Sequence, residues 1–502
     1  MMKQFIVFFA VLLACSSDIF SQQSTVFLHL PVLDASNETE LHFPSQFFTG
    51  NQTALYDTTL GPRIVSAMYS TYYKSRPYAR HGIACSVMIP GRPLLSLAVG
   101  SNDDINPMDT GLVFEVASNT KTFVTALIMK LQDQSKLSIK DTIGKWLPKK
   151  YPNVDGQITI EQLLNHSSGI YDYLNDDPNV IVFEEFFTQP TKIWTTDSIL
   201  FNHVGKPNFK AGTSYQYSNT NFVLAGLIAE QAGGAPLGKQ IHTNFIDPLK
   251  LTHTFFGGED SITLPFAHNW SYADTSNPEI DYFDVDKTGQ FSGSWAAGNI
   301  ISTPGDLVRW GNMLYTGQVV SKSALIQMMT VHRWSNGAFY GLGTSRAPYG
   351  NKYLFGHGGS LLGFKSFMWT NPADSVSIAL YLNSDSAPGD PTANDYVLDA
   401  LNEIYRIVKN GVSEKSAIIT SVEVYPNPAS EEIHFALRTG VEGFIKLSMY
   451  NELGIEVRSI LNESLSPGSH VATVQINGLA AGTYFYRIQC SDGIQMGKVL
   501  VR

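Results

Sequence analysis

One short stretch of the chain leads from an apolar run into an amphipathic helix: Val113-Phe114-Glu115-Val116-Ala117-Ser118-Asn119-Thr120-Lys121. The buried face of that helix is expected to consist of Phe123, Val124, Leu127, Ile128 and Leu131. A serine at a helix start meets unpaired backbone N–H groups and the positive end of the helix dipole, which stabilise developing negative charge. Lys121 lies one turn further on the same face, and a buried lysine of lowered pKa can take the proton of such a serine. The pattern also fits a helix-capping serine followed by a surface lysine.

Two other segments place polar side chains between predicted elements. Tyr217-Ser218-Asn219 precedes an expected helix, and Gly356-His357-Gly358-Gly359 lies between two strand-like runs. A Tyr and an Asn two positions apart at a loop apex can both point into one cleft. Glycines beside a strand allow a substrate to approach the backbone. Simpler interpretations are a half-buried tyrosine and a glycine turn with an incidental histidine.

Taken together, these three segments resemble the serine β-lactamase and penicillin-binding-protein superfamily, and most closely its class C, DD-peptidase and esterase branch. The resemblance covers about residues 60–408. Other segments similar to that branch are Glu161-Gln162-Leu163-Leu164-Asn165-His166-Ser167-Ser168-Gly169-Ile170, Ile246-Asp247-Pro248-Leu249, and Ala296-Ala297-Gly298 with Ser302, Thr303 and Asp306. The implied fold is α+β, with an antiparallel sheet flanked by helices and a helical lobe.

The resemblance also implies catalytic roles for three side chains. Ser118 would be the nucleophile that forms an acyl-enzyme, Lys121 its partner, and Tyr217 the general base and later the acid for the leaving group. A free tyrosine with a pKa of about 10 is a poor base at neutral pH, so we expect Lys121 to lower the pKa of Tyr217. Whether Lys121 or Tyr217 takes the first proton stays open.

Further residues would contact the substrate in such an enzyme. By the same resemblance, Asn219 would orient the substrate amide, and His357 takes the first place of the family's Lys/His-Thr/Ser-Gly triad. The oxyanion hole would consist of the backbone N–H groups of Ser118 and Ser360, beside Gly359. We expect no metal and no other cofactor, because the 12 histidines show no metal-ligand spacing.

Four positions depart from the family pattern. His357 stands where β-lactamases usually keep a charged lysine, and histidine is only partly charged near neutral pH. Gly358 has no hydroxyl where relatives place Thr or Ser to bind a substrate carboxylate. Asn299 and Ala211 replace a usual Gly and Pro. The first two departures weaken carboxylate recognition, so we expect an esterase, D-aminopeptidase or amidase rather than a dedicated β-lactamase.

A literal Lys-Thr-Gly also occurs, at 287–289. It lies among Asp281, Asp284 and Asp286 and has no strand-like flanks. It precedes the Ala296 segment, whereas the family triad follows that segment. We therefore assign the triad to the His357 segment.

Periodicity predicts the elements of the hydrolase domain over 60–408. Strands are expected at 83–88, 94–99, 340–344, 352–355, 362–369 and 376–382. Helices are expected from 61 onward and at 118–131, 160–166, 221–231, 237–245, 304–314, 322–329 and 396–408. Strands at both ends of a helical middle indicate one sheet assembled from both ends of the domain.

The beginning of the chain is typical of an exported protein. Lys3 and the apolar run over 5–14 indicate a secretory signal peptide, assigned to 1–21 with cleavage after Ser21. The same region resembles a lipoprotein box, in which Cys15 would be lipidated and retained. Residues 22–59 show no clear period and form an N-terminal extension. No later apolar run is long enough for a transmembrane helix in the mature chain.

A polar linker over 409–421 precedes an all-β pattern over 422–502. Strands are expected at 422–425, 433–437, 444–450, 471–476, 484–489 and 495–501, which predicts a small β-sandwich. Val424-Tyr425-Pro426-Asn427-Pro428, Gly482-Thr483-Tyr484 and Gly497-Lys498-Val499 resemble a C-terminal type IX secretion sorting domain. This resemblance implies the outer-membrane secretion machinery as a partner and a secreted or cell-surface location. A carbohydrate-binding or adhesive module is the alternative.

Charge excludes one class of partner. The chain has 34 Lys and Arg against 44 Asp and Glu, a net charge of −10, and no long basic run, so nucleic acid is not expected to bind. The sequence thus predicts a secreted serine hydrolase that acts on a small-molecule or peptide ester or amide. The alternative is a non-catalytic penicillin- or cell-wall-binding protein on the same scaffold, but such a protein has no need of Ser118, Lys121 and Tyr217 together.

Overall fold

The computed structural model describes residues 60–74, 81–103, 105–148, 150–177, 181–272, 279–333, 339–349, 352–384, 393–412, 418–451, 454–490 and 493–502. The predicted signal peptide, Cys15 and the N-terminal extension lie outside these residues. The described chain divides into two compact units, one over 70–401 and the other over 402–502 together with 60–69. Helices α2 (Gly61–Lys74) and α13 (Ala393–Val412) each contribute residues to both units.

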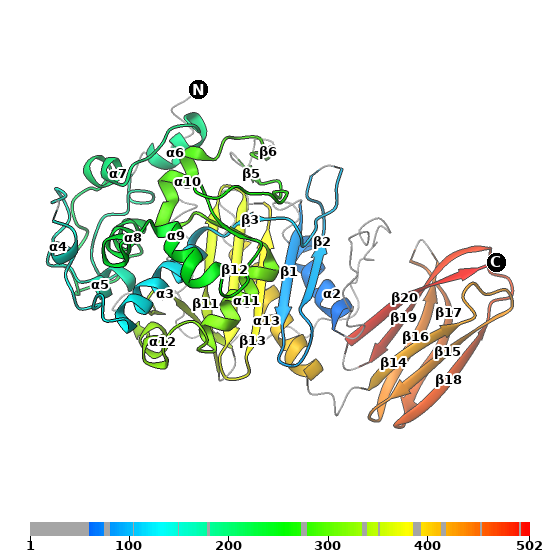
Figure 1. Cartoon of the computed structure of the whole chain (residues 1–502). Coiled ribbons are helices and arrows are strands. Elements are labelled where there is room, and N and C mark those ends of the chain that lie inside the picture. Colours follow the sequence, from blue (N-terminus) through cyan, green and yellow to red (C-terminus); the bar gives the residue numbers. More distant parts are fainter. Residues whose placement is uncertain are drawn as a thin grey trace. The chain divides into compact units, whose positions relative to one another are not determined.

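The first unit is built around an antiparallel sheet of eight strands, in the order β2-β1-β13-β12-β11-β10-β9-β8 (Figure 1). Its strands are β1 (Ile83–Met88), β2 (Leu95–Val99), β8 (His332–Arg333), β9 (Phe339–Tyr340), β10 (Ser345–Tyr349), β11 (Lys352–Leu361), β12 (Phe364–Asn371) and β13 (Val376–Leu382). The first strand pairs with the last: Ile83 lies opposite Leu382, and Met88 lies opposite Ser377. The prediction of one sheet assembled from both ends of the domain is therefore confirmed.

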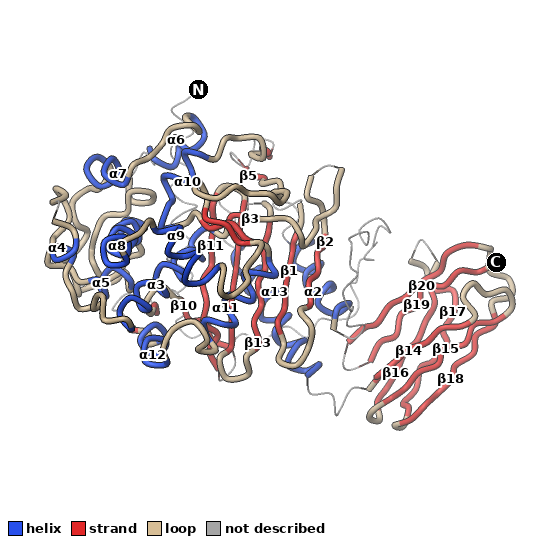
Figure 2. The backbone as a smooth tube through the Cα atoms, in the orientation of Figure 1, coloured by secondary structure: helices blue, strands red, loops and turns tan. Residues whose placement is uncertain are grey.

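Helices flank the sheet and form a lobe beside it, as Figure 2 shows. They are α3 (Thr120–Asp133), α4 (Ile143–Trp146), α5 (Ile160–Leu164), α6 (Ile181–Thr188), α7 (Thr196–Asn202), α8 (Asn219–Gly233), α9 (Leu237–Ile241), α10 (Thr288–Ser294), α11 (Pro304–Tyr315) and α12 (Lys322–Met329), with single turns η3 (Ala117–Asn119), η4 (His242–Ile246) and η5 (Trp295–Ala297). Helix α11 packs against β1, β12 and β13, and α3 packs against α8. The Thr303 side chain accepts the Asp306 N–H and so caps α11, whose first residue is Pro304. The α+β fold class is confirmed.

Two strands near the predicted triad differ from expectation. The strand predicted at 340–344 is wrong, because Gly343 has a φ of +57° and interrupts it, and β10 begins only at Ser345. The glycine-rich segment after 355 is no turn, because β11 continues to Leu361 and pairs with β12 throughout. A Cβ on Gly356 would lie 1.8 Å from the Met368 carbonyl oxygen, so glycine is required where the two strands meet.

A small sheet leads the chain into α3. Its three strands, in the order β3-β7-β4, are β3 (Phe114–Glu115), β7 (Ile300–Ser302) and β4 (Thr254–Phe256). Phe114 lies opposite Ser302, and Glu115 lies opposite Ile301. This sheet anchors the residues directly before Ser118. The sequence does not predict it, because strands of two or three residues carry no recognisable period.

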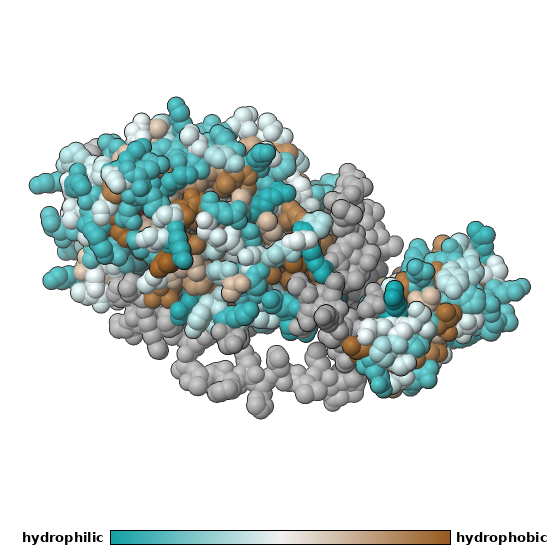
Figure 3. All heavy atoms as spheres, turned by 60° about the horizontal axis from the view of Figure 1, so that its bottom comes forward, coloured by the Kyte–Doolittle hydropathy of each residue, from teal (hydrophilic) through white to brown (hydrophobic). Residues whose placement is uncertain are grey.

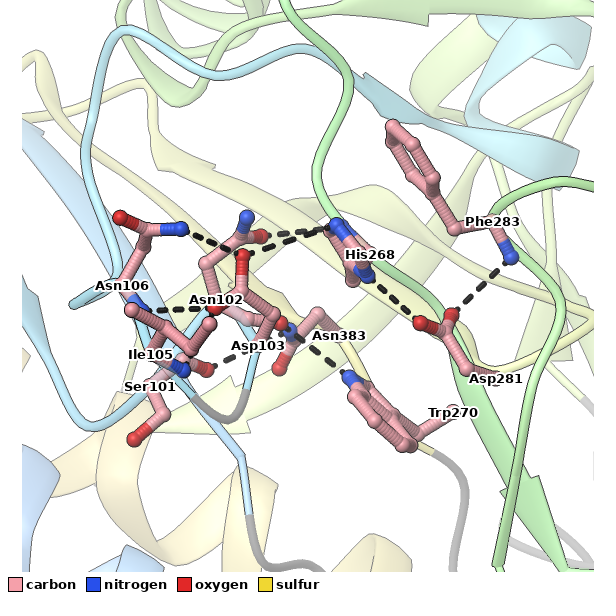
Figure 4. Close-up of polar contacts among 10 residues, drawn as sticks. All are labelled: Ser101, Asn102, Asp103, Ile105, Asn106, His268, Trp270, Asp281, Phe283 and Asn383. Atoms are coloured by element: carbon pink, nitrogen blue, oxygen red, sulfur yellow. Dashed lines mark hydrogen bonds and ion pairs between the residues drawn. The ribbon is translucent and has the colours of Figure 1, made fainter.

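Polar contacts join the loop after β2 to the hairpin of β5 and β6 (Figure 4). The hairpin strands are β5 (Trp270–Tyr272) and β6 (Glu279–Asp281). His268 lies between two carboxylates, with Nδ1 2.6 Å from Asp281 Oδ2 and Nε2 3.6 Å from Asp103 Oδ2. Trp270 Nε1 donates to the carbonyl oxygen of Asn102 at 3.1 Å. These contacts fix the hairpin against a loop that is far from it in the sequence.

The second unit ends in two antiparallel sheets, in the orders β14-β15-β18 and β17-β16-β19-β20. Their strands are β14 (Ile419–Tyr425), β15 (Glu432–Thr439), β16 (Gly443–Tyr450), β17 (Glu456–Leu465), β18 (Gly468–Gln475), β19 (Gly482–Cys490) and β20 (Gly493–Val501). Alternate residues of β15, namely Ile433, Phe435 and Leu437, are buried in the core of this unit. The predicted β-sandwich is confirmed, but strand β17 was missed. Its side chains are exposed or half-buried, so it lacks the alternation that identifies a strand.

The molecular surface gives no sign of a large apolar belt on the side that Figure 3 shows. That face is mostly hydrophilic, with small hydrophobic patches between the polar residues. Within the described ranges, no helix combines the length and apolar character needed to cross a bilayer.

Candidate active site

Ser118 lies at the turn between the small sheet and helix α3. The preceding residue, Ala117, has a φ of +47°, which is uncommon for a residue other than glycine. Two hydrogen bonds hold the turn: Val116 N donates to Ile300 O at 2.9 Å, and Asn119 N donates to Val116 O at 3.1 Å. The turn η3 thus places Ser118 at the N-terminal end of α3, where the helix dipole favours negative charge.

The three predicted catalytic side chains come together at this turn. Lys121 Nζ donates to Ser118 Oγ at 3.0 Å, and Tyr217 OH donates to the same oxygen at 2.8 Å. Tyr217 comes from the segment directly before α8. Ser118 is partly exposed, so a substrate can reach its hydroxyl. Hydrogen-bond contact among these groups is the geometry that nucleophilic catalysis with acid–base assistance requires.

Lys121 is fully buried, so the interpretation as a surface lysine is wrong. Besides Ser118, its Nζ donates to Asn219 Oδ1 at 2.8 Å and to Ala297 O at 2.7 Å. Burial lowers the pKa of Lys121 to about 7, although the nearby Asp172 carboxylate acts in the opposite direction. A neutral amine keeps two N–H groups for Asn219 and Ala297, and its lone pair then faces the Ser118 hydroxyl.

The expectation of a lowered Tyr217 pKa is wrong. Burial raises the pKa of Tyr217 well above its ordinary value, and the hydrogen bond with Ser118 only opposes that change. Lys121 Nζ lies 4.9 Å from the centroid of the Tyr217 ring. Tyr217 is therefore a protonated phenol at neutral pH, and it donates its hydrogen to Ser118.

His357 lies on β11 beside these residues, but it is uncharged. Its Nε2 is 2.7 Å from Tyr340 OH, and its Nδ1 is 2.5 Å from Gly358 O. A carbonyl oxygen only accepts, so Nδ1 carries the hydrogen and Nε2 accepts the hydrogen of Tyr340. Burial, together with the charge of Lys121, lowers the pKa of His357 to about 3. The expectation of a partly charged histidine is therefore wrong.

The glycines of β11 differ in what they allow. A Cβ on Gly359 would lie 2.2 Å from Val116 O and 2.6 Å from Ser366 Oγ, so glycine is required where β11 meets the turn before Ser118. The nearest atom to a Cβ on Gly358 is 3.5 Å away, so that position has room for a side chain. Ser360 is exposed. Its part in an oxyanion hole stays a prediction.

Two buried residues of the site were not among the predicted site residues. The carboxylate of Asp172 accepts hydrogen bonds from Asn219 Nδ2 at 3.0 and 3.3 Å, and burial raises its pKa to about 6. His166 accepts the Ser218 N–H at 3.1 Å and packs against the Tyr217 ring, with centroids 4.3 Å apart. Burial lowers the pKa of His166 well below its ordinary value. The only sequence signal for these residues is their position. His166 lies in the family-like segment over 161–170, and Asp172 lies two residues after that segment.

The Lys-Thr-Gly at 287–289 has a different environment. Lys287 directly precedes helix α10, and its Nζ lies 3.5 Å from Glu115 Oε1. Glu115 is buried on β3, and burial raises its pKa. This lysine therefore forms an ion pair behind the turn of Ser118 and does not lie on a strand of the large sheet.

The site combines a hydroxyl, an amine and a phenol within hydrogen-bond reach. Such a set can form and hydrolyse an acyl ester on the serine. In the part of the chain that the structure describes, no group of three His, Cys, Asp or Glu side chains is arranged to hold a metal ion.

Two family models match the chain. The beta-lactamase model matches residues 71–402, which is more than half of the chain. The model of the secretion system C-terminal sorting domain matches residues 423–502.

Curated relatives are similar to about half of the chain. Protein flp of Staphylococcus aureus (strain MRSA252) is 26% identical over 291 residues, which are 54% of this chain and 53% of that protein. Penicillin-binding protein 4* of Bacillus subtilis (strain 168) is 26% identical over 277 residues, 52% of this chain and 58% of that protein. The chain thus spans about half the length of the curated relatives it matches.

A solved structure agrees with the family match. The D-stereospecific amidohydrolase from Streptomyces sp. has a TM-score of 0.59 and 29% identity, over 67% of this chain and 97% of that one. The sheet, the helical lobe and the Ser118 turn all lie within the matched region. This chain therefore belongs to the beta-lactamase family and ends in a secretion system sorting domain.

Proposed function

We propose that the protein is a serine hydrolase that cleaves an ester or amide through an acyl-enzyme on Ser118. One observation carries the proposal: Ser118 Oγ lies within hydrogen-bond distance of both Lys121 Nζ at 3.0 Å and Tyr217 OH at 2.8 Å. A buried amine with a pKa of about 7 and a protonated phenol are a complementary base and acid at neutral pH.

In acylation, Ser118 Oγ attacks the carbonyl carbon of the substrate while its proton passes to the neutral Lys121 amine. The carbonyl oxygen takes up negative charge beside the N-terminal end of α3. The leaving amine or alkoxide departs with the proton of Tyr217, and the Lys121 ammonium returns a proton to the tyrosine oxygen. Water then attacks the acyl ester by the same exchange of protons, and Ser118 is released. In this scheme Lys121 is the first base.

The preferred substrate has no carboxylate beside the scissile bond. His357 is neutral and uses both ring nitrogens within the protein, and Gly358 supplies no hydroxyl. A substrate carboxylate there would lose charge-assisted hydrogen bonds, each worth about 1.5–3 kcal/mol. The likeness to a D-stereospecific amidohydrolase supports amides with a D-configured acyl group as the substrate class.

The proposal assigns catalysis to residues 60–408 and export to residues 422–502, joined by the linker over 409–421. The match to the secretion system sorting domain over 423–502 supports delivery by the outer-membrane secretion machinery to the cell surface or the medium. Removal of residues 423–502 should leave kcat/KM unchanged and abolish delivery, and a truncated protein that is still delivered would contradict this assignment.

Intact-mass analysis after reaction with a fluorophosphonate tests the catalytic proposal. The wild type should gain one adduct, located on Ser118, and Ser118→Ala should gain none. Ser321→Ala is the matched control: Ser321 caps helix α12 by accepting the Ala324 N–H. It should lose the roughly 1 kcal/mol of a capping serine but keep its labelling. An unlabelled wild type would overturn the proposal and favour a non-catalytic binding protein.

Steady-state kinetics test the substrate class. We expect kcat/KM for a D-amino acid p-nitroanilide or a p-nitrophenyl ester to exceed that for a chromogenic cephalosporin about 100-fold, which corresponds to about 2.7 kcal/mol. A wild type that prefers the cephalosporin would contradict the inferred lack of carboxylate recognition.

A further inference from the structure

We propose that Asp172 is a positioning residue for Lys121 and that it acts through the side chain of Asn219. The inference rests on the proposed function, because it concerns the same acyl transfer. Asn219 Oδ1 accepts from Lys121 Nζ at 2.8 Å, and Asn219 Nδ2 donates to Asp172 Oδ2 at 3.0 Å and Oδ1 at 3.3 Å. All three side chains are buried, so water does not compete for these contacts.

The partners at its two ends allow the Asn219 carboxamide a single orientation. In the flipped orientation, its NH₂ group would face the Lys121 ammonium, which only donates, and its oxygen would face a carboxylate, which only accepts. Asp172 therefore determines which atom of Asn219 meets Lys121. The carboxamide has partners at both ends, whereas the family resemblance assigns it to the substrate amide.

Asp172 is itself held in place by its own loop. Leu174 N donates to its carboxylate at 3.0 Å, and Asn175 Nδ2 donates at 2.5 Å. The Asp172 N–H donates to Asp176 Oδ2 at 2.8 Å. A carboxylate fixed in this way gives the Asn219 amide a rigid partner, and hence gives Lys121 a fixed acceptor.

The hydrogen-bonded link from Asp172 through Asn219 to Lys121 determines where the lone pair of Lys121 points. Lys121 has two acceptors besides Ser118, namely Asn219 Oδ1 and Ala297 O. When both acceptors are fixed, a neutral Lys121 has no free N–H group and turns its lone pair toward Ser118 Oγ. The negative charge of Asp172 favours the protonated amine and so opposes the lowering of the Lys121 pKa by burial.

Other titratable groups also surround the link. They are His166 after α5, Tyr171, Tyr173 and Asp176 in the loop of Asp172, Tyr217 before α8, and His357 on β11. Burial lowers the pKa values of both histidines and raises those of the three tyrosines, so all five are neutral near pH 7. Asp176 contacts the backbone of Asp172 and not Asn219. Among these described groups, Asp172 is the anion linked to Lys121.

The test is the rate of Ser118 labelling by a fluorophosphonate between pH 5 and 9. In the wild type, the rate should rise with pH and level off around a midpoint of about 7. Asp172→Asn should lower this midpoint by about one pH unit, because a charge that favours protonated Lys121 is lost. Its plateau should fall about 10-fold, because the amine is no longer held in place.

Two further variants sharpen the test. Asp155→Asn makes the same substitution at an aspartate that accepts the Gln157 N–H, and its midpoint should stay within about 0.3 units of the wild type. Asn219→Leu removes the amide that joins Asp172 to Lys121 and the acceptor that favours the ammonium, so its midpoint should fall.

The outcomes separate this inference from the proposed function. A purely structural role of Asp172 would reduce the plateau or the folded fraction without moving the midpoint, and that result overturns the inference. If Asp172→Asn does not fold, an unchanged or raised midpoint in Asn219→Leu overturns it instead. A wild type that is not labelled at Ser118 overturns the proposed function itself.

Discussion

Lys121 and His357 are two buried bases at one site, and only Lys121 titrates near neutral pH. Burial lowers the pKa of both side chains. Lys121 is linked to the Asp172 carboxylate through one amide group, and its pKa falls from 10.5 to about 7. His357 faces the neutral Tyr340 hydroxyl and a backbone carbonyl, and its pKa falls to about 3. Burial lowers both pKa values by a similar amount, so the ordinary pKa of lysine, about four units above that of histidine, decides which side chain can carry a charge near pH 7.

Lys121 and His357 therefore serve different functions in the site. Lys121 can exchange a proton at neutral pH. His357 is uncharged, which suits an amide or ester substrate without a carboxylate. Four variants would break or sharpen this comparison.

The largest effect is expected at Lys121. Lys121→Arg keeps a positive charge, but a guanidinium does not release its proton in proteins and so cannot act as a base. We expect kcat/KM for a p-nitrophenyl ester to fall about 10³-fold. Lys130→Arg, in the same helix, is the control and should be close to wild type. Retention of more than about a tenth of the activity in Lys121→Arg would show that Lys121 is not the base.

Tyr217→Phe tests the acid side of the site. It removes the proton for the leaving group, so kcat for an amide should fall about 100-fold. The loss should be much smaller for a p-nitrophenyl ester, whose leaving group departs as an anion. An equal loss with both substrates would mean that Tyr217 acts as a base in the first step, as the family resemblance implies.

A positive charge at position 357 should change the substrate specificity more than the rate. Gly358 has room for a side chain, so His357→Lys with Gly358→Thr can supply the ammonium and hydroxyl that bind carboxylates in relatives. The ratio of kcat/KM for a chromogenic cephalosporin to that for the ester should rise about 10-fold, or 1.4 kcal/mol. Gly358→Thr alone is the control. No change in the ratio would place carboxylate recognition elsewhere.

The smallest kinetic effect is expected for His357→Gln, whose side-chain oxygen can still accept from Tyr340. Activity at pH 7 should stay within about threefold of the wild type, because His357 transfers no proton.

The pH dependence of stability should change more clearly than activity in His357→Gln. The pKa of His357 is lower in the folded protein than in the unfolded chain, so its contribution is present above about pH 6.5 and is lost as pH falls towards 3.

The stability effect can be measured by urea unfolding between pH 4 and 7. In the wild type, this histidine should lower the free energy of unfolding by about 1.4 kcal/mol for each pH unit below 6.5. His357→Gln should remove that share of the slope. An identical acid slope in both proteins would mean that His357 is already charged in the folded state, which would break the comparison with Lys121.

Much of the fold could be predicted from periodicity, because long elements repeat their pattern several times. Strand β1 and helix α12 have the predicted bounds. The short strands β3 and β7 could not be predicted, because they carry no period and exist only through pairing between distant residues. The glycines of β11 suggested a break, but a neighbouring strand requires Gly356 and the Ser118 turn requires Gly359.

The candidate site could be predicted only in part. The resemblance pointed to Ser118, Lys121 and Tyr217, and the structure brings their side chains together. The charges could not be predicted, because pKa values depend on burial and on partners that the fold supplies. The link from Lys121 to Asp172 joins three separate segments, so no local pattern records it.

The pairing of β1 with β13 also has a consequence for how the chain folds. Ile83 needs Leu382 as its partner, and the helical lobe lies between them in the sequence. Contacts of such long sequence separation form slowly, and at about 5–20 residues per second the ribosome needs on the order of tens of seconds to supply the second strand. Until then, the β1–β2 hairpin has an open strand edge that can pair with other chains. The edge of β1 therefore becomes covered only when β13 is in place.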